Sequence, residues 1–223
     1  KEIMLEIACF EITSAETALK SVADRIEFCD NIDLGGTTPN FYEFRYLKSN
    51  YATPIYVMIR PKGGSFFYSE AEFTEMKSNI ISFREAGADG FVFGVLDVNN
   101  EIDEEKNTAL IALAGDRPCT FHRAFDRTAD LDKSIQTLIS LGFKTVLTSG
   151  GKPDATKGQK NLKELISKYG NQIEILIGGG VRSENVQQLK EFTGATSFHS
   201  SAILKYDTFV SEEEIKKLKM LSS

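Results

Sequence analysis

Two histidines are the residues best suited to chemistry in this sequence of 223 residues, which contains no others. His122 lies in TFHRAFD (120–126), and His199 lies in a similar segment, SFHSSA (197–202). Each follows a phenylalanine after a short apolar run, so each is expected at the end of a buried strand. Three roles fit this placement: a metal ligand, a member of an acid/base or anion-binding site, or a hydrogen-bonded core residue.

Two glutamates lie within equally apolar segments. Glu6 is in LEIAC (5–9), and Glu27 is in RIEFC (25–29). A buried carboxylate costs free energy unless it is paired or binds a metal. Because core packing gives no reason for a glutamate at either position, we predict that at least one of the two belongs to a functional site.

Eight apolar segments rich in Val, Ile, Phe and Thr alternate with segments of helical periodicity. Near-continuous apolarity is typical of parallel strands that are buried on both faces. Eight such units predict an α/β fold, a (β/α)8 TIM barrel, with residues 1–223 forming a single domain. An open, doubly wound sheet is the alternative. The expected strands are 5–9, 25–29, 54–59, 90–94, 119–122, 145–148, 174–178 and 196–200.

Three local patterns indicate where helices begin. The segments TSAE (13–16) and SEAE (69–72) match the capping box, in which a Ser or Thr and a Glu three residues later cap a helix reciprocally. Thr38-Pro39 matches an N-cap followed by a proline at the first helical position. We therefore expect a helix to begin at each of these places.

The functional face of a β/α barrel lies at the carboxyl ends of its strands. Because side chains alternate between the two faces of a strand, Cys29 shares the face of Glu27, and Arg123 is directed outward to an ion pair with a neighbouring helix. A cluster with charges of both signs is the form in which such groups can be buried. The candidate catalytic residues at this mouth are Glu6, Glu27, Arg60, His122, Asp126 and His199.

A second signal lies in the last two loops. Three consecutive glycines close an expected strand and lead into an expected helix. Glycines leave backbone N–H groups accessible, and a helix N-terminus with free N–H groups favours an anion. The candidate anion- or cofactor-binding residues are Gly178, Gly179, Gly180, Ser200 and Ser201.

The composition limits the classes of partner. A formal net charge of −6 without a basic stretch argues against nucleic acids and anionic membrane surfaces. No apolar run approaches the roughly 18 residues of a membrane span, and we expect no signal peptide because residues 1–10 already resemble a strand. Three cysteines without CxxC spacing are not a disulfide framework. We therefore expect a cytoplasmic protein whose partner is a small molecule or a metal ion.

Seven segments in fixed order span nearly the whole chain: RIEFCDNIDLGGTTP (25–39), MIRPKGGSFFYSEAE (58–72), GFVFGVLD (90–97), TFHRAFD (120–126), VLTSGG (146–151), GGGVRSENV (178–186) and FHSSA (198–202). Together they resemble the CutC family. The resemblance implies a cytoplasmic single-domain barrel that forms homo-oligomers, dimers or tetramers, and that acts in copper homeostasis or copper binding.

The resemblance makes Cys29 the candidate metal ligand and copper, as Cu(I), the candidate cofactor. Family members often carry a cysteine two residues after the glutamate of the first strand, where this chain has Ala8. The cysteine here is Cys9, on the opposite face of the strand by alternation. Because Cu(I) prefers soft thiolate ligands, a site with Cys29 alone, or with Cys29 and a histidine, is poorer in them.

Two other functions stay open on the sequence. The first is an enzyme acting on a small anionic or carbohydrate-like metabolite, in which Glu6, Glu27 and His122 transfer protons and Arg60 stabilises charge. The second is a structural or regulatory barrel that binds a protein partner.

Overall fold

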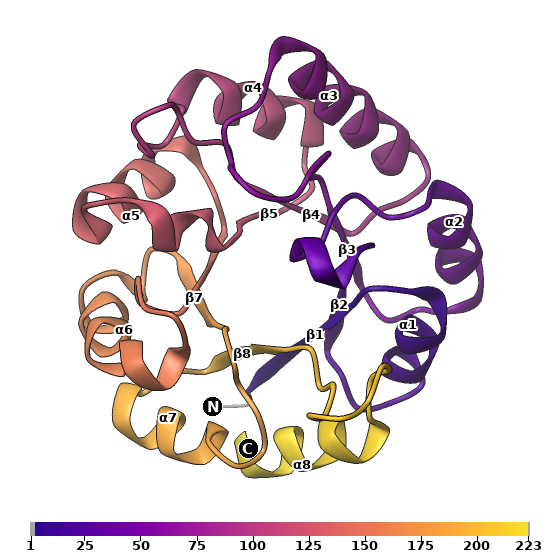
Figure 1. The fold of residues 1–223 in the computed structure, drawn as a ribbon, viewed down its shortest axis with the longest axis vertical. Helices are drawn as coiled ribbons and strands as arrows, with labels where there is room; N and C mark the ends of the chain where they lie inside the picture. Colours follow the sequence, from indigo (N-terminus) through magenta and orange to yellow (C-terminus); the bar gives the residue numbers. More distant parts are fainter. Residues whose placement is uncertain (1–2, 223) are drawn as a thin grey trace.

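A closed barrel of eight parallel strands, in the chain order β1 to β8, forms the centre of the computed structural model, which describes residues 3–222. A helix follows each strand, so the helices form a ring around the barrel (Figure 1). The strands are β1 Met4–Cys9, β2 Arg25–Phe28, β3 Ile55–Met58, β4 Gly90–Phe93, β5 Cys119–Phe121, β6 Thr145–Thr148, β7 Glu174–Ile177 and β8 Ser197–Ser200. The α-helices are α1 Ile12–Leu19, α2 Phe41–Asn50, α3 Glu70–Glu85, α4 Glu104–Ala114, α5 Leu131–Leu141, α6 Ala155–Tyr169, α7 Val186–Thr193 and α8 Glu212–Ser222, and the 3-10 helices η1 Ile32–Leu34 and η2 Arg123–Arg127 follow β2 and β5.

These elements confirm the predicted TIM barrel and exclude the open, doubly wound sheet. Each predicted strand agrees with an observed strand to within one residue at either end, which is the ordinary uncertainty of such boundaries. The assignment of all of residues 1–223 to one domain stays a prediction, because residues 1, 2 and 223 lie outside the described part of the chain.

One of the three predicted helix starts is confirmed. Ser69 and Glu72 form a reciprocal capping box at the start of α3. The box predicted for 13–16 is wrong, because α1 begins at Ile12. Its N-cap is Glu11, whose carboxylate accepts hydrogen bonds from the backbone N–H groups of Thr13 and Ser14. The start predicted at Thr38-Pro39 is also wrong: Asn40 caps α2, and the hydroxyl of Thr38 accepts the backbone N–H of Arg60 instead.

The main core lies between the strands and the helices, and a second, small apolar cluster fills part of the barrel interior. Cys29, Met58 and Val92 form this inner cluster, with Tyr56 packed against it. The ring of Tyr56 takes the space beside Gly90 on β4, where an added Cβ would lie 2.6 Å from the ring. Charged side chains occupy the interior next to this cluster, and they form the site described below.

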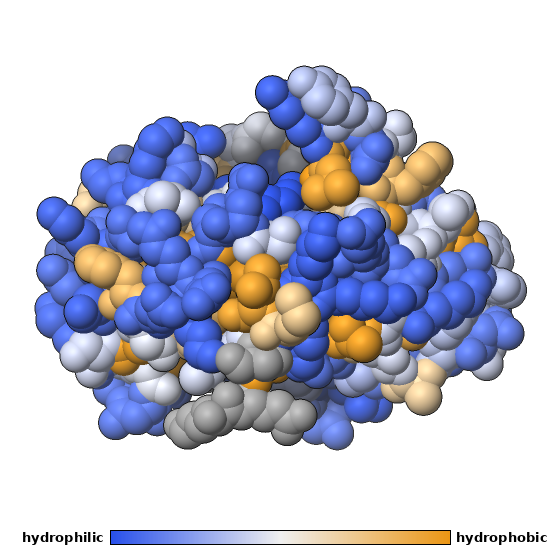
Figure 2. Space-filling view, turned by 90° about the horizontal axis from the view of Figure 1, so that it is seen from below, coloured by the Kyte–Doolittle hydropathy of each residue, from blue (hydrophilic) through white to orange (hydrophobic). Residues whose placement is uncertain are grey.

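The outer surface is mostly hydrophilic. Figure 2 shows the barrel from the side, with apolar side chains in small separate groups among polar ones. Among residues 3–222, no helix combines the length and the apolarity that crossing a membrane requires. Buried charged groups, by contrast, lie at the mouth of the barrel.

Candidate functional site

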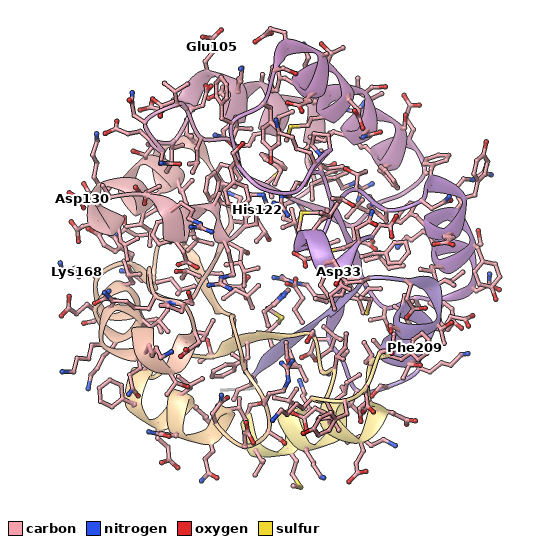
Figure 3. The ribbon with its side chains drawn as sticks, in the orientation of Figure 1. Asp33, Glu105, His122, Asp130, Lys168 and Phe209 are labelled. Carbon is pink, nitrogen blue, oxygen red and sulfur yellow. The ribbon has the colours of Figure 1, made fainter. Side chains whose placement is uncertain are left out.

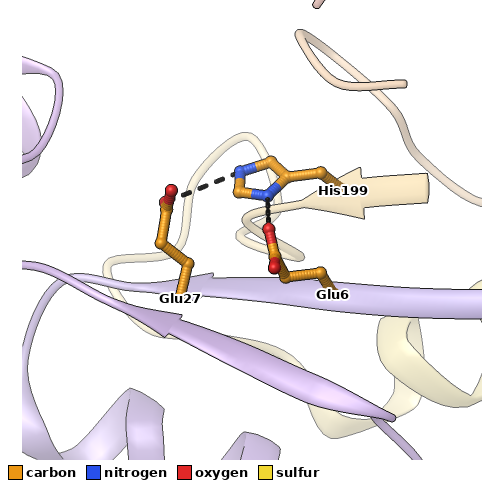
Figure 4. Close-up of side chains that lie close together, drawn as sticks. All are labelled: Glu6, Glu27 and His199. Atoms are coloured by element: carbon orange, nitrogen blue, oxygen red, sulfur yellow. Dashed lines mark hydrogen bonds and ion pairs between the residues drawn. The ribbon is translucent and has the colours of Figure 1, made fainter. Parts of the chain in front are cut away.

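Three adjacent strands bring Glu6, Glu27 and His199 together inside the barrel. Strand β1 pairs with both β2 and β8, and Glu6 is directly opposite His199 in the β1–β8 register. The Nδ1 atom of His199 lies 2.7 Å from Glu6 Oε1, and its Nε2 atom lies 3.8 Å from Glu27 Oε2 (Figure 4). The imidazole is thus held between two carboxylates, and we call these three residues the carboxylate–histidine group.

Arg25 completes the group and was missed by the sequence analysis. Its Nε atom donates to Glu6 Oε2, and its Nη1 atom lies 3.6 Å from Glu174 Oε2. Its guanidinium also lies 4.4 Å from the centre of the Tyr56 ring. Arg25 is two residues before Glu27 and so shares its face. Arg25 lies at the amino end of β2, away from the carboxyl ends of the strands where functional side chains of a barrel are expected.

Electrostatics favour an ionised Glu6 and a protonated His199. Burial by itself would raise the pKa of Glu6, but Arg25 and His199 outweigh it and lower that pKa to about 2. Burial would likewise lower the pKa of His199, but Glu27 and Glu6 outweigh it and raise that pKa. Burial raises the pKa of Glu27, and the charge of Glu6 adds to this effect. Glu27 is therefore the carboxyl that most readily takes up a proton.

Cys29 lies at the edge of the carboxylate–histidine group, as its shared face with Glu27 predicts. Its Sγ atom lies 3.4 Å from Glu27 Oε2, close enough to donate a hydrogen bond. Burial raises the pKa of the Cys29 thiol well above its usual range, and the carboxylate of Glu27 raises it further. Cys9 belongs to the main core outside the barrel interior, so the two thiols lie in different apolar clusters.

Arg60 and His122 lie in a different part of the mouth, and both are next to Phe66. The Arg60 guanidinium is 4.9 Å from the centre of the Phe66 ring, and the His122 ring is 4.8 Å from it. Burial lowers the pKa of His122 to about 3, and the charge of Arg60 adds to this effect, so the imidazole is neutral at physiological pH. Figure 3 shows His122 inside the ring of helices, as predicted, but it is not part of the carboxylate–histidine group.

The expectation that Arg123 points outward to a neighbouring helix is wrong. Its Nε atom donates to Asp126 Oδ2 at 2.9 Å, and its Nη2 atom donates to Ser149 Oγ at 2.7 Å. Strand β5 ends at Phe121, and Arg123 begins the 3-10 helix η2, so the alternation of a strand no longer applies to it. The chain turns there and keeps Arg123 at the mouth.

Asp126 is held by five donors. Besides Arg123, its carboxylate accepts hydrogen bonds from Thr148 Oγ1, from the N–H and hydroxyl of Ser149, and from the N–H of Gly151. All but the Arg123 donor belong to β6 or the loop that follows it. Asp126 therefore fastens this loop to η2, and its catalytic role stays a prediction.

The serine candidates lie beside Arg182, a residue that was not predicted, whereas Gly179 lies against Arg123. Its Nη1 atom donates to Ser200 Oγ at 3.0 Å, and its Nη2 atom donates to Ser201 Oγ at 2.8 Å. Gly178, Gly179 and Gly180 follow β7 and lead into α7, which begins at Val186. Anion binding by these residues stays a prediction, and Arg182 supplies a cation beside the two serines.

The sequence of this chain matches known proteins over most of its length. The CutC family model matches residues 3–204. This chain belongs to the CutC family. It is 41% identical over 199 residues to a human protein named "Copper homeostasis protein cutC homolog", covering 89% of this chain and 73% of that protein. It is 40% identical to a "family protein CutC" of Salmonella typhimurium, covering 89% of this chain and 79% of that protein.

Solved structures agree with this assignment. A putative copper homeostasis protein CutC from Streptococcus agalactiae superposes with a TM-score of 0.85 at 34% identity, over 89% of this chain and 98% of that one. A phosphoribosylanthranilate isomerase from Pyrococcus furiosus has a TM-score of 0.62 at 15% identity, over 99% of this chain and 98% of that one. The second likeness shows the shared barrel fold alone.

Proposed function

We propose that this CutC-family protein acts in copper homeostasis by binding a copper ion at the carboxylate–histidine group. The proposal rests on the convergence of His199 Nε2 and Cys29 Sγ on Glu27 Oε2, at 3.8 Å and 3.4 Å. Two ligands that each lie about 2.0–2.3 Å from one metal ion are roughly 3–4 Å apart. The nitrogen of His199 and the sulfur of Cys29 each lie at such a separation from the oxygen of Glu27. One donor atom from each of Glu6, Glu27 and His199 lies within 4.8 Å of the other two.

Glu6 positions His199 for this role. Metal-binding histidines usually donate their second ring N–H to a carboxylate, which fixes the ring and its tautomer. Glu6 Oε1 is such a partner for Nδ1 of His199, and Arg25 holds the other oxygen of Glu6. The arrangement turns Nε2 toward Glu27, whose Oε1 has no hydrogen-bond partner within residues 3–222.

The oxidation state follows from which donors take part. Cu(I) prefers thiolate sulfur, whereas imidazole nitrogen and carboxylate oxygen also suit Cu(II). Cys29 is the one thiol beside Glu27, and burial raises its pKa, so Cu(I) must displace a firmly held proton. We therefore infer that Cys29 is a ligand of Cu(I), whereas His199 and Glu27 are ligands of copper in either oxidation state.

The names of the family relatives support the copper role over the enzyme and regulatory alternatives. We further propose that the protein works in the cytoplasm, which its three unpaired cysteines support. A homo-oligomer, dimeric or tetrameric, is part of the same proposal.

The test is copper titration of the metal-free protein. Cu(I) is titrated under anaerobic conditions against a competing chelator, and Cu(II) is titrated by calorimetry. We expect one ion per chain, an affinity lowered on the order of 10–100-fold by Glu6→Gln, and a loss in Cys29→Ser that is larger for Cu(I) than for Cu(II). Cys119→Ser, at another buried cysteine, is the matched control. Copper affinity that is the same in wild type, His199→Gln and Cys29→Ser would disprove the site.

A further inference from the structure

A cleft of about 760 Å³ lies at the mouth, and its lining includes none of the residues of the carboxylate–histidine group. The loops after β2, β3, β5 and β6 form its walls. We call it the arginine cleft, because four cationic side chains outnumber two acidic ones in its lining, although the whole chain carries a net charge of −6. The charged lining residues are Arg60, Arg123, Arg127, Lys152, Asp33 and Asp126.

Arg60 is a buried cation without a carboxylate partner. Only 5% of its surface is exposed. Its Nη1 atom donates to the carbonyl oxygens of Leu34 and Gly36 at 2.8 and 2.9 Å, and its Nη2 atom donates to that of Gly64 at 3.4 Å. Within residues 3–222, Nε has no hydrogen-bond partner, and no ion pair to Arg60 is found. A buried charge in this state is costly unless an anion compensates it.

The groups around Arg60 do not supply that anion. The Phe66 ring lies against the guanidinium, and the His122 imidazole next to Phe66 is neutral. Burial raises the pKa of Tyr68 to about 12, so the phenol is neutral as well. The positive charge of Arg60 therefore acts on the cleft without a fixed negative charge beside it.

The acidic residues of the cleft do not cancel its charge. Asp126 is engaged by its five donors, and Asp33 lies on the exposed 3-10 helix η1. Arg123 pairs with Asp126 through Nε, yet 38% of its side chain stays exposed. A guanidinium presents several N–H donors in one plane, which suits carboxylate and phosphate oxygens.

We propose that the arginine cleft binds a small metabolite with a doubly charged oxyanion group, a phosphate ester or a dicarboxylate, and that Arg60 and Arg123 are the principal contacts. The bound anion supplies the counter-charge that Arg60 lacks in the chain itself. This site is independent of the proposed copper site. The loop after β2 touches the copper site, because Gly36 lies against Cys29. The loop after β7 touches both sites, because Gly178 lies against His199 and Gly179 against Arg123.

The test is calorimetric titration of the metal-free protein with inorganic phosphate and, separately, with succinate, at pH 7.5 and constant ionic strength. We expect binding of one anion per chain, and the better of the two probes identifies the ligand class. Arg60→Gln and Arg123→Gln each lower the affinity roughly 10–100-fold, because a hydrogen bond to a charged group is lost. Arg45→Gln, at an exposed arginine on α2, keeps the wild-type affinity.

Three results would overturn the proposal: no binding of either probe, equal affinity in wild type and Arg123→Gln, or an equal loss in Arg45→Gln. Arg123 is partly exposed, so its variant decides the matter even if the buried Arg60→Gln variant fails to fold. Glu27→Gln separates this site from the copper site, since it should lose copper and keep the anion.

Discussion

The buried ion pair between Arg25 and Glu6 should make a large contribution to the free energy of unfolding. In Arg25→Met the side chain keeps much of its volume but loses its charge, and Glu6 stays fully buried beside His199. A carboxyl whose pKa is held at about 2 instead of 4.5 contributes roughly 3 kcal/mol to the free energy of unfolding at neutral pH. Breaking a buried pair by removing one partner costs about 3–5 kcal/mol. We therefore expect Arg25→Met to lose about 3–5 kcal/mol at pH 7.

The loss should depend on pH in a defined direction. The pKa of Glu6 in the folded protein lies below its ordinary value, so the stabilisation is complete above pH 4.5 and disappears as the pH falls toward about 2. In Arg25→Met the lowering by the arginine is lost, so burial raises the pKa of Glu6 and the carboxyl takes up a proton at a higher pH than in the wild type. The difference between wild type and variant should therefore shrink between pH 7 and pH 4.

The assay is urea denaturation at pH 7 and at pH 4, followed by circular dichroism. The control is Arg45→Met, which removes an exposed arginine and should change the free energy of unfolding by less than about 0.5 kcal/mol. The double variant Glu6→Gln/Arg25→Met should recover part of the loss, because it leaves no unpaired charge. A loss below about 1 kcal/mol at pH 7, or an equal loss at pH 4, would refute the reasoning.

Two further predictions concern packing and capping. A Cβ on Gly158 of α6 would lie 1.7 Å from the backbone oxygen of Ser149. Gly158→Ala should therefore destabilise the protein by about 1–3 kcal/mol, despite a gain in helix propensity of about 1 kcal/mol. Thermal unfolding measures the loss against the control Ser167→Ala on the exposed face of α6, and equal stability of the two variants would contradict the prediction. Ser69→Ala removes the capping box of α3 and should cost about 1 kcal/mol, whereas Ser69→Asp, which keeps an acceptor, should unfold near the wild-type temperature.

The sequence was sufficient for the fold, because the barrel depends on a pattern that repeats locally. Each strand is a short apolar run and each helix has its own periodicity, so the alternation is visible without tertiary information. Helix starts were less predictable. Thr38 has the right type for an N-cap, but its hydroxyl binds the N–H of Arg60, a contact between residues that are distant in sequence.

The candidate site was predictable in part. Glu6 and Glu27 were found because a carboxylate in an apolar strand needs a partner, and alternation correctly placed Cys29 beside Glu27. Arg25 was missed because it lies at the start of its strand, and Arg182 because it lies in a loop. No local pattern shows that the guanidinium of Arg182 reaches two serines on β8 and beyond.

Periodicity alone predicted the barrel, the resembling segments predicted the family, and residue type predicted the polar residues at the mouth other than Arg25 and Arg182. Only the tertiary structure divided that set into two sites. Pairing of β8 with β1 brings the His199 ring between the carboxylates of Glu6 and Glu27. His122 instead lies beside Phe66, which also contacts Arg60. The physical reason is that a charge is stabilised by its neighbours in space, and barrel closure, which pairs β1 with β8, decides which residues those are.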